Sequence, residues 1–497
     1  MAEHDSAPVP PVEVDALASI DRLSGPKRAL LEARRAGASN GNGAETRRPG
    51  ALPPETIELS FAQERVWLLE QLAPGLVTYN APRALRLEGV LDVEALQCAL
   101  DEIVRRHQVL RTVVGESDGL PMPRVLPEAR VPMRMVDLGA GDSRNGHGDP
   151  EEQLVRLVEH EVNQPFDLTS DTMLRCLLIR LAPDDHVLVI VSHHIASDDR
   201  SKRIVAAELD VLYRAFRDGT RSPLPPLPMQ YASYAAWERR RVEAGVADED
   251  AAYWCRQLDG APSSIELPSD RPRPSTDSHG GAMYRSSLPG ATTDRLRQLV
   301  RAHRSTLFMG LHAGFVALLR RLSGATDIVV GTPVSGRSRS EFDDMIGFFS
   351  NTLVLRSDVP GRAGFATLLD DVRSVCVDAF SHQLLPFERL VELVKPERDI
   401  SRHPIFQVMF TLRPGGVSVP ELADLVVSPV QFRSSGTKFD LSLIAIDMGD
   451  HVQLNWEYST DLFDEATVAR MAAQFGRLMD QALADPDRPI DELDLLD

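Results

Sequence analysis

The sequence predicts an α/β protein built from two halves of similar plan. Apolar residues at helical spacing over residues 92–106 predict an amphipathic helix, and two runs of strand character, residues 173–181 and 186–191, predict a hairpin. After a proline-rich polar stretch, a helical pattern over residues 292–322 is followed by a strand-like run over residues 327–332. The recurrence of helix and strand indicates two related α/β units, although no clean sequence repeat connects them.

The helix over residues 92–106 has a regular apolar stripe. Asp92 stands at its N-cap position, where a carboxylate oxygen can accept hydrogen bonds from the free backbone N–H groups of the first turn. The stripe consists of Val93, Leu96, Leu100, Ile103 and Val104. This spacing predicts a helix with one buried face.

The next elements follow from turn residues and periodicity. The strand that ends at Val191 begins after the turn-forming residues 183–185, and residues 201–216 return to helical spacing. Glu208 falls inside the apolar stripe of that helix, which leaves open how deeply the helix is buried. Prolines in residues 223–228 then interrupt the chain before a further helix. Its aromatic residues, together with an earlier tryptophan, are predicted to fill the core; they are Trp67, Tyr234 and Trp237.

The length of 497 residues exceeds one ordinary core, because domains usually contain roughly 100 to 200 residues. Residues 1–55 are rich in Ala, Pro, Gly and Arg and are predicted to be a mobile tail that could serve in docking. An N-terminal lobe is predicted over residues 56–258 and a C-terminal lobe over residues 284–497. Residues 259–283 contain several prolines and are the predicted linker.

Composition excludes several classes of protein. No apolar run approaches the roughly 18 residues that a membrane helix needs, and the polar N-terminus does not resemble a signal peptide, so a cytoplasmic location is expected. The net charge of −19 argues against a general nucleic-acid binder. Four widely spaced cysteines are expected to be buried structural thiols; they are Cys98, Cys176, Cys255 and Cys376.

Two histidines and two aspartates cluster just past the strand that ends near Val191. They are His193, His194, Asp198 and Asp199. Strand ends beside a rigid core often meet substrates, and the ordinary pKa of histidine, roughly 6.5, suits proton transfer near neutrality. A metal site of these ligand types is chemically possible but disfavoured, because adjacent residues on an extended backbone point to opposite sides. The cluster is therefore a candidate active site without a metal.

Several stretches, in order along the chain, resemble the motifs of the condensation domains of nonribosomal peptide synthetases. The sequence HHIASDD at residues 193–199 is similar to the HHxxxDG signature of that family. The other matching stretches are residues 60–72, 79–82, 106–112, 230–237, 346–352, 382–388 and 398–404. HHxxxD alone also occurs in chloramphenicol acetyltransferase-like acyltransferases, whereas the stretches around Ile346 and Arg398 point to the peptide-synthetase branch.

The resemblance implies two chloramphenicol-acetyltransferase-like lobes arranged as a V-shaped pseudodimer around a central tunnel. Phosphopantetheine arms of carrier proteins would enter the tunnel from opposite sides. The resemblance further implies that His194 is the catalytic base or positions the acceptor, with His193 in support. Asp198 is then structural and pairs with Arg337, because an unpaired buried charge would be costly.

The residues suit direct acyl transfer from a thioester. A thioester is already activated, so His194 and a backbone N–H that meets the oxyanion would suffice. The sequence contains no GxSxG elbow, no GxxxxGK phosphate loop and no GxGxxG helix start, so the chain is expected to bind no cofactor of its own. Asp199 replaces the family's glycine, and its carboxylate could crowd the tunnel or raise the pKa of His194.

We therefore expect a stand-alone condensation enzyme of secondary metabolism. It would transfer a carrier-bound acyl or aminoacyl group to an amine or hydroxyl acceptor, with a carrier protein as its partner. The alternative is a noncatalytic module that recruits carrier proteins or tailoring enzymes, because noncatalytic relatives also carry a double-Asp ending, although they lack the second histidine. His107 and His382 are expected to be structural.

Overall fold

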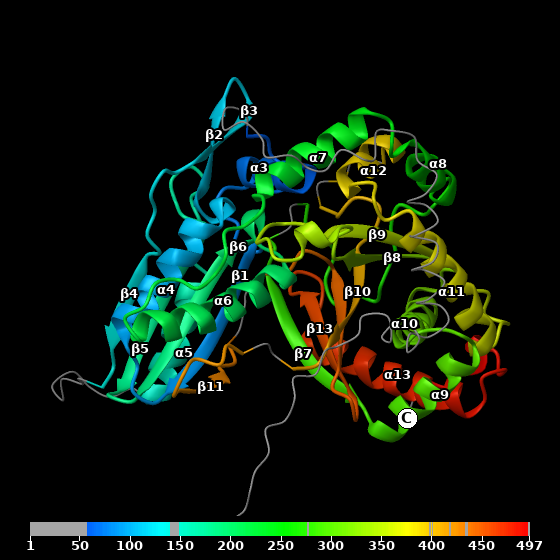
Figure 1. The fold of residues 1–497 in the computed structure, drawn as a ribbon. Helices are drawn as coiled ribbons and strands as arrows, with labels where there is room; N and C mark the ends of the chain where they lie inside the picture. Colours follow the sequence, from blue (N-terminus) through cyan, green and yellow to red (C-terminus); the bar gives the residue numbers. More distant parts are fainter. Residues whose placement is uncertain are drawn as a thin grey trace, which may run out of the picture.

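The computed structural model describes residues 57–139, 149–275, 278–396, 399, 401–416, 419–432 and 436–495. The predicted N-terminal tail, and Arg398 in the last matching stretch, lie outside these residues. Within them the strands form a five-stranded sheet, a six-stranded sheet and a two-stranded hairpin. Figure 1 shows the two larger sheets in separate lobes, each flanked by helices. None of the helices in these ranges is both long and apolar enough to cross a membrane.

The five-stranded sheet has the order β11-β1-β6-β5-β4. All its neighbouring strands are antiparallel except the parallel pair β4 and β5. The strands are β11 (Val426–Pro429), β1 (Asn80–Glu88), β6 (Asp185–His193), β5 (Leu174–Ala182) and β4 (Met133–Asp137). The predicted hairpin is thus confirmed as β5 and β6. The edge strand β11 comes from the second half of the chain, so the first sheet is completed by a distant segment.

The helices predicted over residues 92–106 and 201–216, and the further helix predicted after the prolines, are present as α4 (Val93–Arg106), α6 (Asp199–Arg217) and α7 (Tyr231–Glu243). The first half of the chain also forms α3 (Phe61–Leu72), α5 (Pro150–Val162) and α8 (Asp248–Gln257), of which α8 packs into the second lobe. Asp92 caps α4 by accepting a 2.9 Å hydrogen bond from the Ala95 N–H. The separate hairpin consists of β2 (Thr112–Ser117) and β3 (Leu120–Val125), and the turn Gln108–Arg111 precedes it. Trp67 and Tyr234 are buried in the core, and Trp237 packs against it partly buried.

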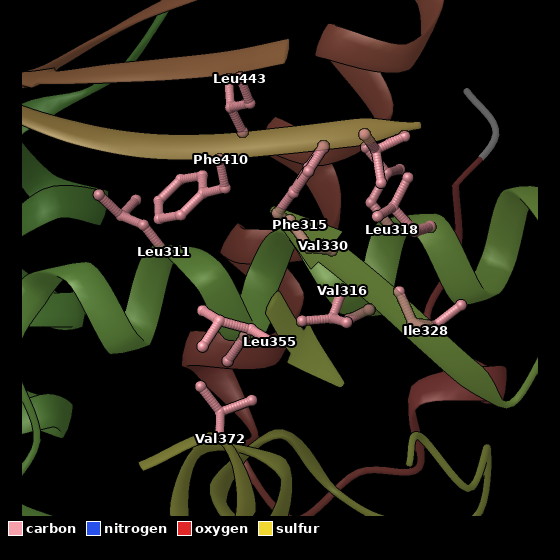
Figure 2. Close-up of a cluster of buried hydrophobic side chains, with 14 of the residues drawn as sticks. Leu311, Phe315, Val316, Leu318, Ile328, Val330, Leu355, Val372, Phe410 and Leu443 are labelled. Carbon is pink, nitrogen blue, oxygen red and sulfur yellow. The ribbon is translucent and has the colours of Figure 1, made fainter. Parts of the chain in front are cut away.

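The six-stranded sheet has the order β7-β13-β12-β10-β8-β9. Its strands are β7 (Gly281–Leu288), β13 (Val452–Ser459), β12 (Leu441–Asp447), β10 (Val408–Pro414), β8 (Asp327–Val334) and β9 (Asn351–Asp358). The helices that accompany it are α9 (Gly290–Ala302), α10 (Leu307–Ser323), α11 (Phe365–Ser381), α12 (Phe387–Val394) and α13 (Glu465–Ala484). Figure 2 shows side chains of α10, among them Leu311 and Phe315, gathered with Phe410 of β10 in this core.

The prediction of one helix over residues 292–322 was wrong. The structure has two helices, α9 and α10, with a break between Ala302 and Leu307. Arg304 has a φ of 52°, in the left-handed region that a helix cannot contain. Thr306 then caps α10 by accepting a hydrogen bond from the Met309 N–H at 3.3 Å. A left-handed residue followed by an N-cap thus ends one helix and starts the next.

The two buried cores do not divide at the proline-rich stretch. Trp254 and Leu258, on and just after α8, belong to the core of the second sheet although they precede residue 259. In the other direction, Phe342, Phe349 and Leu422 belong to the core of the first sheet. The chain therefore exchanges segments between the lobes, and the domain boundaries at residues 258 and 284 stay a prediction.

The expectation of four buried cysteines was half wrong. Cys176 and Cys376 are buried, whereas Cys98 and Cys255 are exposed, and all four thiols are free. Cys98 lies on α4 outside the apolar stripe predicted for that helix, which explains its exposure. Burial thus follows the position of each cysteine on its helix or strand rather than the residue type.

Candidate active site

The candidate segment lies where β6 passes into α6. The strand ends at His193, a short turn spans His194–Ala196, and α6 begins at Asp199. Neighbouring strands hold the backbone on both sides: the His193 N–H donates to the Met173 carbonyl at 3.1 Å, and the His194 N–H donates to the Tyr79 carbonyl at 2.8 Å. The two imidazoles therefore sit on backbone that is fixed by the sheet.

His193 is enclosed by the core. Its side chain is buried beside the rings of Phe166 and Tyr79, whose centroids lie 5.4 and 6.3 Å away. Its Nδ1 accepts a 3.3 Å hydrogen bond from the Ile195 N–H, which fixes the turn. Burial, and then the positive charge of Lys438, lower the pKa of His193 to about 3. This imidazole is neutral near pH 7 and supports the loop from inside.

His194 is partly exposed, and its ring lies beside Ser197 and Phe348 rather than among the rings that enclose His193. Its Nδ1 lies 3.0 Å from the Ser197 carbonyl, and its ring centroid lies 5.9 Å from that of Phe348. Because a carbonyl oxygen only accepts, Nδ1 must carry the proton, and Nε2 presents a lone pair. Burial, followed by the charges of Lys438 and Lys202, holds the pKa of His194 well below its usual value. The imidazole is therefore a neutral hydrogen-bond acceptor at physiological pH.

Asp198 is buried and surrounded by donors. Its carboxylate accepts from the Ser201 N–H and the Ser201 hydroxyl, both at 2.7 Å, and from the Phe349 N–H at 3.3 Å. Arg337 Nη2 lies 3.1 Å from Oδ1 and 3.3 Å from Oδ2. The ion pair implied by the resemblance is thus present. These contacts make Asp198 the N-cap of α6 and occupy both of its oxygens.

Arg337 connects this carboxylate to a distant loop of the second half. Its Nη1 donates to the carbonyls of Phe342 and, at 2.8 Å, of Met345, and its guanidinium lies 3.9 Å from the ring centre of Phe349. The side chain is only 4% exposed. We call Asp198, Ser201 and Arg337 the brace. It ties the start of α6 to residues 342–349.

The loop fits the brace closely enough to require glycine at position 347. The Ser201 oxygen lies 2.9 Å from the Gly347 carbonyl oxygen and accepts from the Gly347 N–H at 3.1 Å. A Cβ atom on Gly347 would lie 2.0 Å from Cδ2 of Tyr231, inside that ring's van der Waals surface. The hydroxyl of Tyr231 in turn donates to the Phe348 carbonyl at 2.6 Å. Phe348 is consequently held beside His194.

Asp199 faces away from the brace. Its side chain is 57% exposed, and Oδ1 lies 3.9 Å from Arg413 Nη1. The pKa of His194 is lowered overall by burial and by two lysines, so any upward effect of the Asp199 carboxylate, which stays a prediction, does not decide its protonation. The structure gives Asp199 cationic neighbours, Lys202 and Arg83 in addition to Arg413.

Lys202 and Lys438 are site residues that the motifs did not indicate. Burial lowers the pKa of Lys202 to about 8 and that of Lys438 to about 7, and in each case neighbouring cations add to the effect. The Lys438 ammonium lies 4.5 Å from the ring centre of Tyr79. One signal was available in the sequence, because Lys202 occupies the same face of α6 as Val205, Ala206 and Leu209.

Two further histidines, both predicted to be structural, have packing partners. His107 Nε2 lies 2.9 Å from Glu208, which also pairs with Arg106 at 2.8 Å. This resolves why Glu208 interrupts the apolar stripe of α6: it is buried with two basic partners. His382 lies 2.8 Å from Asp250 and stacks on Tyr253. Each of these two histidines therefore pairs with a carboxylate from another helix, His107 with Glu208 of α6 and His382 with Asp250 of α8.

Comparison with known proteins gives a consistent family. The chain is 39% identical over 442 residues to a subunit of the linear gramicidin synthase of Brevibacillus parabrevis, and the match covers 88% of this chain and 6% of that protein. It is 40% identical over 474 residues to phosphinothricin tripeptide synthetase PhsC of Streptomyces viridochromogenes, covering 94% of this chain and 43% of that protein. The chain thus spans less than half the length of these curated relatives.

Solved structures share the fold. The X-domain from teicoplanin biosynthesis is 29% identical with a TM-score of 0.84, and 90% of this chain and all of that chain are covered. The first condensation domain of the calcium-dependent antibiotic synthetase is 23% identical with a TM-score of 0.73, over 90% of this chain and 100% of that one. The family model described as the condensation domain matches residues 54–497. The chain belongs to the condensation-domain family of nonribosomal peptide synthetases.

Proposed function

We propose that this chain transfers an acyl or aminoacyl group from the thioester of a carrier-protein phosphopantetheine arm to an amine or hydroxyl acceptor. The observation that carries the proposal is the state of His194. Its imidazole is neutral, its Nδ1 proton is held by Ser197, and its Nε2 lone pair has no hydrogen-bond partner among the residues that the structure describes. A group in this state can accept the proton of an acceptor.

The transfer then needs no covalent intermediate between the acyl group and the enzyme. The acceptor nitrogen or oxygen attacks the thioester carbonyl carbon, and its proton passes to His194 Nε2 as the new bond forms. The tetrahedral intermediate collapses with cleavage of the carbon–sulfur bond, and the proton moves to the departing sulfur. The products are an amide or ester and the free thiol of the arm.

The lysines support this use of His194. Lys438 and Lys202 disfavour a proton on the imidazole and would equally disfavour one on an amine acceptor placed beside it. Only the free amine is nucleophilic, so the same charges favour the reactive form of both partners. The backbone N–H groups of His194, Ile195 and Ser197 are already engaged within the protein, so the oxyanion needs another donor.

Incubation with acyl-loaded and aminoacyl-loaded carrier proteins and a panel of amine and alcohol acceptors tests the proposal. We expect product with the native chain and a loss of about 10²- to 10⁴-fold in rate for His194→Ala. His303→Ala is the matched control, because His303 lies at the end of α9 paired with Asp370. Equal rates for the native chain and His194→Ala would disprove the role of His194.

A recruitment module is the second candidate function. One solved structure of this fold is the complex of the X-domain and OxyB from teicoplanin biosynthesis, with a TM-score of 0.82 and 29% identity. The motif of this chain ends in two aspartates, and the second of them, Asp199, is exposed. This local feature favours the recruitment function. Carrier-protein binding without product from any donor and acceptor pair would support recruitment in place of transfer.

A further inference from the structure

An aromatic side chain from the second half of the chain lies beside His194. The ring centroid of Phe348 is 5.9 Å from that of His194, and the two ring planes are inclined by 50°. Phe348 is 8% exposed and belongs to the core of the first sheet. A bulky apolar ring therefore forms one wall of the space around the imidazole that is proposed as the base.

The backbone that carries this ring is fixed at three consecutive residues. The Phe348 carbonyl accepts a 2.6 Å hydrogen bond from the Tyr231 hydroxyl. The N–H groups of its two neighbours, Gly347 and Phe349, donate to oxygens of the brace at 3.1 and 3.3 Å. The backbone cannot carry the ring away from His194 unless these hydrogen bonds break.

Phe348 also borders a hollow that lies among α7, the start of β9 and the start of α12. Trp237, Asn351 and Glu388 are among its lining residues. The hollow encloses about 550 Å³, part of it open to solvent, but only about two water molecules fit inside it. The native hollow is therefore too narrow for a substrate side chain.

The carboxylates at the border of the hollow already have partners. Glu238 accepts hydrogen bonds from the Phe61 N–H at 3.0 Å and from the Tyr234 hydroxyl at 2.9 Å. Glu388 pairs with Arg65 at 3.2 Å. Selection of a ligand at this place thus depends on size and apolar contact rather than on an unpaired charge.

We infer that Phe348 is a specificity-determining residue, whose ring limits the size of the substrate side chain that can lie next to His194. The ring contacts the imidazole, and the same residue borders the hollow. Removal of the ring would join the hollow to the space beside the imidazole. The inference rests on the proposed function and deepens it. The side chain in question belongs either to the donor or to the acceptor, and it is apolar in both cases.

Calorimetric titration of the full chain tests the size limit without any transfer step. The probes are the pantetheine amides of alanine and of 3-(2-naphthyl)alanine, in which NH replaces the thioester sulfur. The measured quantity is the ratio of the two affinities. Phe348→Ala should shift this ratio about tenfold toward the naphthylalanine probe, because the larger ring gains apolar contacts that the native side chain blocks.

Two further variants keep this test independent of folding defects. Phe348→Leu retains an apolar side chain in the core and should give a smaller shift of the same sign. Phe216→Ala is the matched control, because Phe216 at the end of α6 packs against the same core and does not border the hollow. It should lose stability and leave the ratio of affinities unchanged.

Two series of transfer assays with loaded carrier proteins identify the substrate concerned. The first series varies the donor side chain with one acceptor, and the second varies the acceptor side chain with one donor. In one series, Phe348→Ala should raise kcat/KM for the naphthylalanine substrate about tenfold relative to the alanine substrate. The series that shows this gain assigns the side chain to the donor or to the acceptor.

Three results would overturn the inference. They are an unchanged affinity ratio in both Phe348 variants, an equal shift in Phe216→Ala, and no binding of the naphthylalanine probe to Phe348→Ala at millimolar concentration. Transfer by the native chain together with an unchanged ratio would reject this inference alone. A shifted ratio in a chain that transfers no substrate would reject the proposed function and keep the size limit at Phe348.

Discussion

Within the segment from His193 to Asp199, equivalent side chains have opposite environments. His193 and Asp198 turn inward and are fully enclosed, the one by aromatic rings and the other by the brace. His194 is partly exposed, and Asp199 is exposed over more than half of its side chain. Two pairs of identical residues thus divide into an enclosed pair and a pair that solvent reaches.

Under the proposed function, this difference assigns structural support to the enclosed pair and chemistry to the accessible pair. A change in the enclosed pair should reduce the stability of the fold, because it leaves buried groups without partners. A change in the accessible pair should alter turnover with little effect on stability. The following predictions test this division, from the largest effect to the smallest.

His194→Ala should separate turnover from stability most clearly. We expect the transfer rate to fall by about 10²- to 10⁴-fold, because the acceptor loses its base. The free energy of unfolding should change by less than about 1 kcal/mol, since the ring is partly exposed and makes one hydrogen bond in the described structure. Urea denaturation and a rate assay on the same preparation measure both. A loss of stability as large as that of a brace variant would contradict the division.

Arg337→Ala should have the opposite effect, with its main loss in the stability of the fold. Removal of the guanidinium leaves Asp198 buried without its cation, and we expect about 3 to 5 kcal/mol lower stability by urea denaturation. The double variant Asp198→Ala with Arg337→Ala should cost less than the sum of the single variants, because the two groups are coupled. Additive losses would show that the pair is not a unit.

Tyr231→Phe tests the uncharged part of the inward network. Its hydroxyl donates to the Phe348 carbonyl at 2.6 Å and lies 2.9 Å from the Ser60 oxygen. We expect a loss of about 1 to 2 kcal/mol in unfolding free energy, as for a buried hydrogen bond left incomplete. Tyr234→Phe on the same helix is the comparison, because its hydroxyl bonds Glu238 instead. No change for Tyr231→Phe would remove this residue from the network.

The pH dependence of kcat/KM reports the environment of His194 directly. Because its pKa lies below the usual value, the neutral base should persist at pH 6.5 and activity should decline only at lower pH. Among neighbouring charges, that of Lys438 lowers the pKa of His194 most, so Lys438→Met should raise this pKa and move the acid limb of the profile to higher pH. A shift to lower pH would contradict the assigned sign.

Asp199→Gly and Asp199→Asn should have the smallest effects. The pair with Arg413 is long and exposed, so unfolding free energy should change by less than about 1 kcal/mol. The glycine variant removes bulk and charge, whereas the asparagine variant removes charge alone. A gain in turnover for glycine only would identify crowding. Equal changes in both would identify an electrostatic effect.

Sequence patterns predicted the local elements well and the long-range pairings poorly. The helix over residues 92–106 and the hairpin of β5 and β6 follow from spacing that is contained within each segment. The pairing of β11 with β1 joins Val427 to Leu87, residues with no local signal for each other. The break before α10 could be predicted in part from the sequence, because Thr306 is a typical N-cap residue.

Site residues that belong to a sequence motif could be predicted. Site residues that meet only through tertiary packing could not. The pair of Asp198 and Arg337 came from resemblance, whereas the contacts of Ser201 with Gly347 arise only when α6 meets the distant loop. Lys438 lies on a loop before β12 and reaches the ring of Tyr79 across the two halves. No periodicity connects such residues.

The strand β11 has a consequence for attempts to exchange parts between condensation proteins. Because residues 426–429 form the edge of the first sheet, a chimera joined at the proline-rich stretch would pair β1 with a foreign strand or leave it bare. A bare edge strand invites aggregation. The same junction would separate α6 from its partner loop at residues 342–349. The smallest unit suited to transplantation is thus the complete pair of lobes.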